Sequence, residues 1–161
     1  MTIYFYKAWQ PYGCFSNFSY HGIKMQDTYW STVEHYYQAQ KFVGTKDAAI
    51  IPVIRVAETP EQAAALGRCS DRQVRSDWEK VKTDVMYQAV FAKFIHHKDI
   101  QEILCNTGDE LLIENSPVDY FWGCGANQTG ENQLGKILMR VRTEIFHLMQ
   151  IDTYRSTSLY S

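Results

Sequence analysis

The segment that most constrains the fold is Trp30–Phe42, where aromatic, acidic, basic and amide side chains follow one another without a helix breaker. Ser31 followed three residues later by Glu34 predicts a capping box, in which the hydroxyl accepts an early backbone N–H and the carboxylate reaches back. The next glycine is Gly44, where a helix could end. The segment therefore predicts a helix of about three turns.

On such a helix two faces separate clearly. Tyr36 and Ala39 share an apolar side, whereas Glu34, Gln38 and Lys41 recur at i, i+4 and i+7 on the opposite side. One interpretation is a surface helix with a solvated polar face. The other is that this face lines a pocket in which a carboxylate, an amide and an amine act on a small polar substrate. Periodicity alone leaves both open.

Length and composition limit the class of protein. The chain has 161 residues, a formal net charge of -2 and four cysteines without a C-x-x-C pair. This length fits one domain with a real core, and the near-neutral charge argues against a broad electrostatic grip on nucleic acid. Scattered cysteines favour free thiols in a reducing cytoplasm, and neither a signal peptide nor a membrane-spanning run is expected.

The rest of the chain predicts mainly helices with a few short strands. Strands are expected over 3–6 and 111–114, a strand or one arm of a hairpin over 20–25, and helices over 47–57, 59–67, 76–96, 99–106 and 134–148. Thr59-Pro60 and a Gln three residues after the Thr form a strong helix start. From Gln150 the pattern dissolves, so residues 150–161 are predicted to form a flexible tail after a domain spanning 1–149.

Several polar or aromatic residues outside the first helix have two interpretations. Asn17 could bond its own turn or present its amide to a ligand, and Arg68 could complement a helix C-terminus or bind phosphate. Trp78 could plug the core or line a pocket. A second cluster places Asp119 and Trp122 beside glycines, and the glycines there match neither a dinucleotide fingerprint nor a P-loop.

Taken together, these segments resemble the NADAR-domain, YbiA-like family over nearly the whole span from Tyr4 to Leu148. The matching stretches are Phe15-Ser16-Asn17-Phe18, Thr32 to Phe42, Gly67-Arg68, Trp78-Glu79-Lys80-Val81-Lys82 with Met86, Asp119-Tyr120-Phe121-Trp122-Gly123, and Asn132 to Met139. One departure is Gly123-Cys124-Gly125, where the family usually has an acidic residue and a glycine.

The resemblance implies a single compact, α-rich α+β domain with a small β-sheet that cleaves a C–N glycosidic bond. It implies catalytic roles for Glu34, Lys41 and Asp119, and substrate-binding roles for Asn17, Trp30, Arg68, Trp78, Trp122 and Gly123. Glu34 is the expected acid/base or electrostatic group, and Asp119 is expected to orient water or sugar hydroxyls. Lys41 has two candidate roles, electrostatic positioning or attack on an opened sugar to form a Schiff base. No metal and no cofactor are expected.

Three functions fit that chemistry. The first is an N-glycosidase for phosphoribosylamino-pyrimidine intermediates of riboflavin biosynthesis, releasing ribose 5-phosphate. The second is a hydrolase that removes ADP-ribose from modified guanine in nucleic acid, and the third is a silent module that binds ADP-ribose-like ligands. The slightly acidic charge favours a free small molecule as the substrate. No membrane partner is expected.

Overall fold

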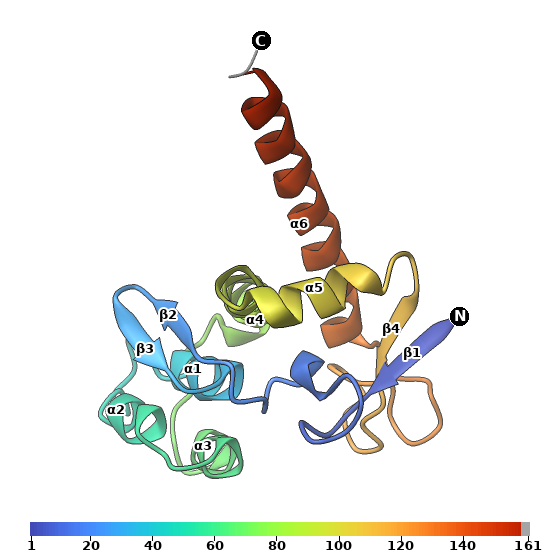
Figure 1. The fold of residues 1–161 in the computed structure, drawn as a ribbon. Coiled ribbons are helices and arrows are strands. Elements are labelled where there is room, and N and C mark those ends of the chain that lie inside the picture. Colours follow the sequence, from blue (N-terminus) through green and yellow to red (C-terminus); the bar gives the residue numbers. More distant parts are fainter. Residues whose placement is uncertain (159–161) are drawn as a thin grey trace. The chain divides into compact units, whose positions relative to one another are not determined.

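The computed structural model describes residues 1–158, with side chains through Asp152, and it consists of helices with short strands (Figure 1). In chain order the elements are β1 (Thr2–Phe5), the 3-10 helix η1 (Gly13–Phe15), β2 (Ile23–Met25), β3 (Thr28–Trp30), α1 (Val33–Gln40), α2 (Ile50–Arg55), α3 (Pro60–Arg68), α4 (Trp78–His96), α5 (Lys98–Asn106), β4 (Leu111–Glu114) and α6 (Gln133–Ser158). The chain forms two compact units, Phe5–His96 and Met1–Tyr4 with His97–Ser161. We call them the α1 unit and the α6 unit.

The α1 unit is built around its first helix. Helix α1 contacts α2, α3 and α4, and α4 also contacts β2. Strands β2 and β3 form an antiparallel hairpin in which Ile23 pairs with Trp30. The two residues of its turn, Gln26 and Asp27, both have positive φ, as a type I′ hairpin turn requires. The sequence predicted a strand or one arm of a hairpin over 20–25, and the second arm, β3, was not assigned.

Helix α1 begins one residue later than the predicted capping box. Thr32, in extended conformation, is the N-cap, and its hydroxyl accepts the His35 N–H at 3.2 Å. Ser31 is therefore not the cap, and the prediction was wrong on this point. Because Thr32 takes the cap, the Glu34 carboxylate contacts other side chains on the helix face.

The α6 unit joins a two-stranded sheet to two helices. Strand β4 pairs with β1, and α6 contacts both β4 and α5. The side chain of Asn132, just before α6, accepts the Glu114 N–H at 3.0 Å and donates to the Leu112 carbonyl at 2.8 Å. It thereby fixes the start of α6 against β4.

The α+β class is confirmed, with the strands forming two separate pairs. Most predicted helices lie within a few residues of their expected positions, and Thr59 caps α3 as predicted. Helix α6 runs to Ser158, beyond the expected end near Leu148. Residues 159–161 of the predicted tail lie outside the described residues, and the boundary at 149 stays a prediction.

Candidate active site

Glu34 is a buried carboxylate on the polar face of α1. Its side chain is about 5% exposed, and its Oε1 accepts a 2.7 Å hydrogen bond from Gln38 Nε2 one turn later. The same oxygen lies 3.9 Å from the Arg68 guanidinium, which itself is mostly exposed. A carboxylate is rarely buried unless it is paired, so its place here marks a built site rather than a solvated helix face.

Lys41 lies one turn beyond Gln38 and belongs to the same cluster. Its Nζ donates to the Gly67 carbonyl at 3.3 Å and lies 5.7 Å from the centre of the Tyr37 ring. Burial lowers the pKa of Lys41, the Glu34 carboxylate raises it, and the Arg68 and Lys82 charges lower it further. A depressed lysine pKa increases the fraction of free amine, the form that can act as a nucleophile.

The close approach of α3 depends on Gly67. A Cβ on Gly67 would lie 2.7 Å from the Cβ of Gln38 and would also overlap its amide oxygen. The absence of a side chain therefore lets α3 lie against the polar face of α1. Arg68, the next residue and the last of α3, is thereby carried to Glu34.

The start of α4 completes this cluster. Trp78 is buried, and its ring centre lies 5.1 Å from that of Tyr37. The preceding loop is tied to α1, because the Lys41 carbonyl accepts the Arg75 N–H at 2.8 Å. One turn after Trp78, the mostly buried side chain of Lys82 pairs with Glu79 at 2.5 Å.

Asn17 and Trp30 have different surroundings. The Asn17 carbonyl accepts the Glu34 N–H at 3.1 Å, and its buried Oδ1 has no hydrogen-bond partner among the described residues. Trp30 is buried in edge-to-face contact with Tyr36, with ring centres 5.5 Å apart. The backbone of Asn17 thus lies beside that of Glu34, and Trp30 packs like a core residue, although its buried Nε1 also has no hydrogen-bond partner among the described residues.

The α6 unit holds the other three predicted residues, Asp119, Trp122 and Gly123. Oδ1 of Asp119 accepts the backbone N–H groups of Phe121 and Trp122, at 2.9 and 2.7 Å, which fixes the orientation of the carboxylate. A Cβ on Gly123 would lie 2.9 Å from Ser116 Cβ and 3.0 Å from the Glu114 carbonyl oxygen, so loop packing accounts for this glycine.

The structure thus groups Glu34, Lys41, Arg68, Trp78 and Asn17 within the α1 unit. Tyr37 and Lys82 lie in the same cluster and were not predicted. Gln38 lies there too, as in the interpretation that the polar face of the first helix lines a pocket. Lys82 lies four residues after Trp78, which would place both on one side of a helix, but no pattern in the sequence assigned that side to the site.

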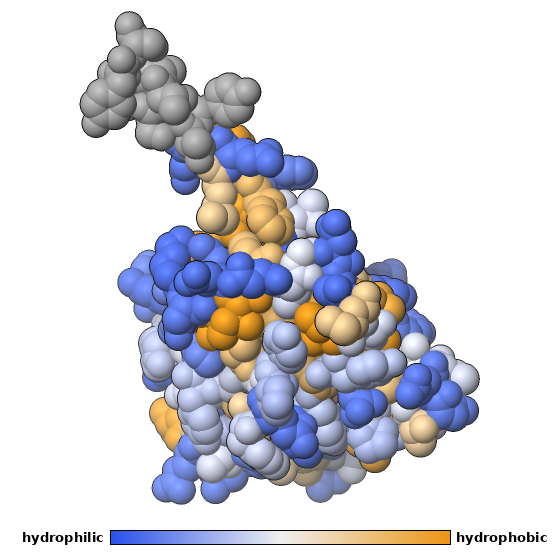
Figure 2. Space-filling view, turned by 45° about the vertical axis from the view of Figure 1, so that its right-hand side comes forward, coloured by the Kyte–Doolittle hydropathy of each residue, from blue (hydrophilic) through white to orange (hydrophobic). Residues whose placement is uncertain are grey.

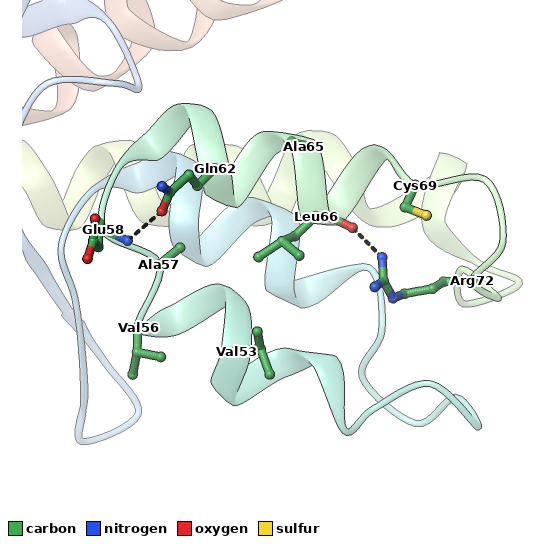
Figure 3. Close-up of a pocket in the computed structure, with 9 residues that line it drawn as sticks. All are labelled: Val53, Val56, Ala57, Glu58, Gln62, Ala65, Leu66, Cys69 and Arg72. Atoms are coloured by element: carbon green, nitrogen blue, oxygen red, sulfur yellow. Dashed lines mark hydrogen bonds between the residues drawn. The ribbon is translucent and has the colours of Figure 1, made fainter.

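A separate groove lies between α2 and α3 (Figure 3). It encloses about 750 Å³ and is lined by Val53, Val56, Ala57, Glu58, Gln62, Ala65, Leu66, Cys69 and Arg72. None of the predicted site residues lines it. The evidence that the Glu34 cluster is a site is therefore its buried polar contacts, because the groove lies elsewhere.

The described part of the chain has neither a cluster of metal-ligating side chains nor a membrane-spanning helix. No three His, Cys, Asp or Glu side chains there lie close enough together to hold a metal ion. None of the helices there combines the length and the apolar character needed to span a membrane.

Comparison with known proteins then decides the family. The NADAR domain pattern matches residues 4–146. The chain belongs to the NADAR domain family. The resemblance inferred from the sequence motifs is thereby confirmed.

Relatives of this NADAR chain carry informative names. An N-glycosidase of Nostoc punctiforme is 71% identical over 94% of this chain and 97% of its own length. A chloroplastic riboflavin biosynthesis protein PYRR of Zea mays is 45% identical over 89% of this chain, which spans only 25% of that longer protein. The NMR structure of E. coli YbiA superimposes with a TM-score of 0.84 at 37% identity, covering 93% of this chain and 89% of YbiA.

Proposed function

We propose that this protein hydrolyses the C–N glycosidic bond of phosphoribosylamino-pyrimidine intermediates of riboflavin biosynthesis and releases ribose 5-phosphate. The bond type rests on the relatives, since an N-glycosidase 71% identical over nearly the full length of both chains makes this chain an N-glycosidase too. The substrate class draws on the relative named as a riboflavin biosynthesis protein. We also propose a cytoplasmic location, which four cysteines that form no disulfide within the described structure support.

The observation that carries the proposal is the buried Glu34 carboxylate with cations around it. The Arg68 guanidinium lies 3.9 Å from the Glu34 carboxylate. Lys41 lies close enough to Glu34, Arg68 and Lys82 for the charge of each to shift its pKa. N-glycoside cleavage develops positive charge on the sugar, which a carboxylate stabilises. A phosphate on the same sugar needs cations, and an arginine such as Arg68 can fork onto it.

The chemistry needs one water and one proton carrier. As the C–N bond breaks, the nitrogen keeps the bonding electron pair and takes a proton. The water oxygen bonds to the anomeric carbon and loses a proton. Glu34 is the group proposed to carry that proton, with Gln38 holding its Oε1 at 2.7 Å. General acid–base catalysis of this kind contributes a rate factor of about 10² to 10⁴.

Lys41 keeps two proposed roles. It can stabilise the negative charge of Glu34 and the phosphate. Alternatively, its free amine can attack C1 of the ring-opened imine form of the substrate, and the lysine Schiff base forms as the bond from C1 to the pyrimidine nitrogen breaks and that nitrogen leaves as the protonated amine. Water then hydrolyses the Schiff base to ribose 5-phosphate and the free lysine. The lowered pKa of Lys41 supports the second role. Borohydride would reduce such an adduct to a stable amine, detected as added mass on the Lys41 peptide. If no added mass forms during turnover, only the electrostatic role is left.

The decisive experiment is a time course of product release followed by HPLC and mass spectrometry. One substrate is the ribosylamino-pyrimidine 5-phosphate, and the other is a DNA oligomer carrying ADP-ribosylated guanine. Wild type is compared with Glu34→Gln and with Glu61→Gln, a matched change at an exposed glutamate of α3. Asp119→Asn and Trp122→Phe test the predicted residues of the α6 unit.

We expect ribose 5-phosphate from the first substrate, normal turnover in Glu61→Gln and a loss of about 10² or more in Glu34→Gln. Release of ADP-ribose from the oligomer alone would make the protein a nucleic-acid hydrolase and overturn the proposed substrate. Binding of ADP-ribose without any product from either substrate would leave a binding module. Near-normal turnover in Glu34→Gln would remove Glu34 from its assigned role.

A further inference from the structure

Lys93 in α4 is a buried lysine that the proposed chemistry does not use. Its side chain is 1% exposed, and along the helix its neighbours Ala89, Val90 and Phe94 are buried as well. Its Nζ donates a 2.9 Å hydrogen bond to the carbonyl of Ser16, a residue 77 positions earlier in the chain. The amine thus reaches from the core of the α1 unit to the Ser16–Asn17 loop, which follows η1.

Stability does not explain why a lysine occupies this position. Burial lowers the pKa of Lys93 to about 7, and the nearby Cys14 opposes that shift only in part. Desolvating an amine is costly. The Ser16 carbonyl also accepts the Ser19 N–H at 3.1 Å, so removing the amine leaves no unpaired acceptor at this carbonyl. An unbranched apolar side chain such as Met would fill the same space. The lysine therefore supplies something that an apolar side chain cannot, which is its bond to Ser16.

The loop that Lys93 bonds is also the loop that supports the start of α1. The Asn17 carbonyl accepts the N–H of Glu34 at 3.1 Å, which satisfies one of the N–H groups that a helix start leaves open. The Asn17 side chain is buried, and its Oδ1 has no hydrogen-bond partner in the described part of the chain. Two consecutive backbone carbonyls therefore link Lys93 to Glu34. The Ser16 carbonyl accepts from the Lys93 amine, and the Asn17 carbonyl accepts from the Glu34 N–H.

We propose that Lys93 is a positioning residue of the active site, because its bond to the Ser16 carbonyl sets the place of the Ser16–Asn17 loop and, through it, of Glu34 and the Asn17 amide. The proposal rests on the proposed function insofar as Glu34 is the catalytic carboxylate. It assigns Lys93 no contact with substrate. A misplacement of about 1 Å in a catalytic group can cost a factor of about 10² in rate, so even a small movement of this loop would be measurable.

The test compares Lys93→Met, which removes the donor, with Lys93→Gln, which keeps a shorter N–H donor. Lys24→Met, at an exposed lysine of β2, is the matched control. Three quantities are measured for each protein: the melting temperature, kcat and KM on the ribosylamino-pyrimidine 5-phosphate, and the ¹H–¹⁵N NMR signals of the Glu34 amide and the Asn17 side-chain amide.

We expect Lys93→Met to melt at or above the wild-type temperature while kcat falls about tenfold or more and both NMR signals move. Lys93→Gln should recover part of kcat, and Lys24→Met should match wild type. Wild-type kcat with unmoved signals in both Lys93 variants would overturn the proposal. If Lys93→Met does not fold, Lys93→Gln is compared with wild type by the same criteria.

The NMR signals separate this proposal from the proposed function. If wild type cleaves neither substrate, the proposed function fails, yet movement of the Glu34 and Asn17 signals in Lys93→Met still supports the positioning role. If wild type is active and the signals stay in place, only the positioning role fails.

Discussion

At the scale of single residues, the charge of Lys41 is set by competing neighbours. Burial and the Arg68 and Lys82 charges lower its pKa, whereas the Glu34 and Glu79 carboxylates raise it. Each neighbour therefore offers a separate way to shift the titration of the amine. This makes the nucleophilic role of Lys41 testable without changing Lys41 itself.

We predict that Arg68→Gln raises the pKa of Lys41, because it removes a positive charge that lowers this pKa. If the free amine is the nucleophile, activity falls as pH drops through that pKa, so the acidic limb of kcat/KM moves to higher pH in the variant. The pH profile is measured on the dephosphorylated substrate, so that loss of the proposed contact between Arg68 and the phosphate does not affect kcat/KM. Arg55→Gln, at an exposed arginine of α2, is the control. An unmoved limb contradicts a nucleophilic Lys41.

The sequence correctly predicted which side chains share a helix face, because the helical period alone determines this. The spacing of Glu34, Gln38 and Lys41 placed them on one face, and the structure joins the first two by a hydrogen bond. The spacing could not indicate that this face is buried, because α3 and α4, which cover α1, come from later parts of the chain. Lys93 was out of reach for the same reason, since its partner Ser16 lies 77 residues away.

At the scale of elements, the contact between α1 and α3 depends on a glycine. In a helix interior, replacing Gly with Ala usually stabilises by about 1 kcal/mol. At Gly67 the added methyl would meet Gln38, including its Cβ at 2.7 Å, which cannot move without the helix. Gly67→Ala is therefore a case in which propensity and packing predict opposite signs.

We predict that Gly67→Ala lowers the free energy of unfolding by about 1–3 kcal/mol, as overpacking does. It should also reduce kcat, because a displaced Gln38 no longer holds Glu34. Chemical denaturation and steady-state kinetics measure the two effects, with Ala65→Ser on the exposed side of α3 as the control. A gain in stability would show that α3 can move away from α1 at little cost.

Helix α4 allows a prediction about pH. The folded pKa of Lys93 is about 7, below its ordinary value of 10.5, so between these values the unfolded chain holds a proton that the folded chain lacks. The free energy of unfolding therefore rises with pH from about 7 to 10.5. Below pH 7 the folded chain carries the buried charge, and the destabilisation by this charge is complete. Removing the amine should help most where that cost is largest.

We therefore predict that the melting temperature of Lys93→Met exceeds that of wild type by the largest margin below pH 7, and that the margin shrinks as pH rises toward 10.5. Scanning calorimetry across this range measures it, with Lys24→Met to remove general effects of losing a lysine. A margin that is constant with pH would mean that Lys93 keeps its charge state on folding.

Most local sequence signals identified their elements. The Thr59 cap and the apolar period of α6 identified their helices, whereas β3 was missed because Trp30 was taken as the start of the segment that forms α1 and Thr28 and Tyr29 were assigned to no element. The prediction of Ser31 as the cap was wrong for a different reason. Ser and Thr are both good N-cap residues, and the capping-box spacing from Ser31 to Glu34 favoured Ser31 over Thr32. The backbone conformation of Thr32, extended at φ -145°, decides between them.

At the scale of the whole molecule, the tail boundary at 149 is still untested. Helix α6 contacts β4 and α5, and its inward-facing residues Leu134, Leu138, Val141 and Ile145 are buried. From Phe146 to Asp152 every side chain is exposed, including Leu148, Met149 and Ile151. Figure 2 shows apolar surface on this part of α6, next to the atoms drawn in grey. The last buried side chain of the described helix is thus Ile145.

We predict that a chain shortened to residues 1–149 keeps wild-type kcat/KM and melts within a few degrees of the full chain, because residues 150–152 bury no side chain and the proposed active-site residues lie earlier in the sequence. A chain that ends at residue 140 is the opposing control, since it also loses Val141 and Ile145, and two buried aliphatic side chains are worth roughly 3–6 kcal/mol. It should unfold at a much lower temperature. A loss of activity in the 1–149 chain without a loss of stability would instead give residues 150–161 a part in function, and the domain boundary would move to the end of the chain.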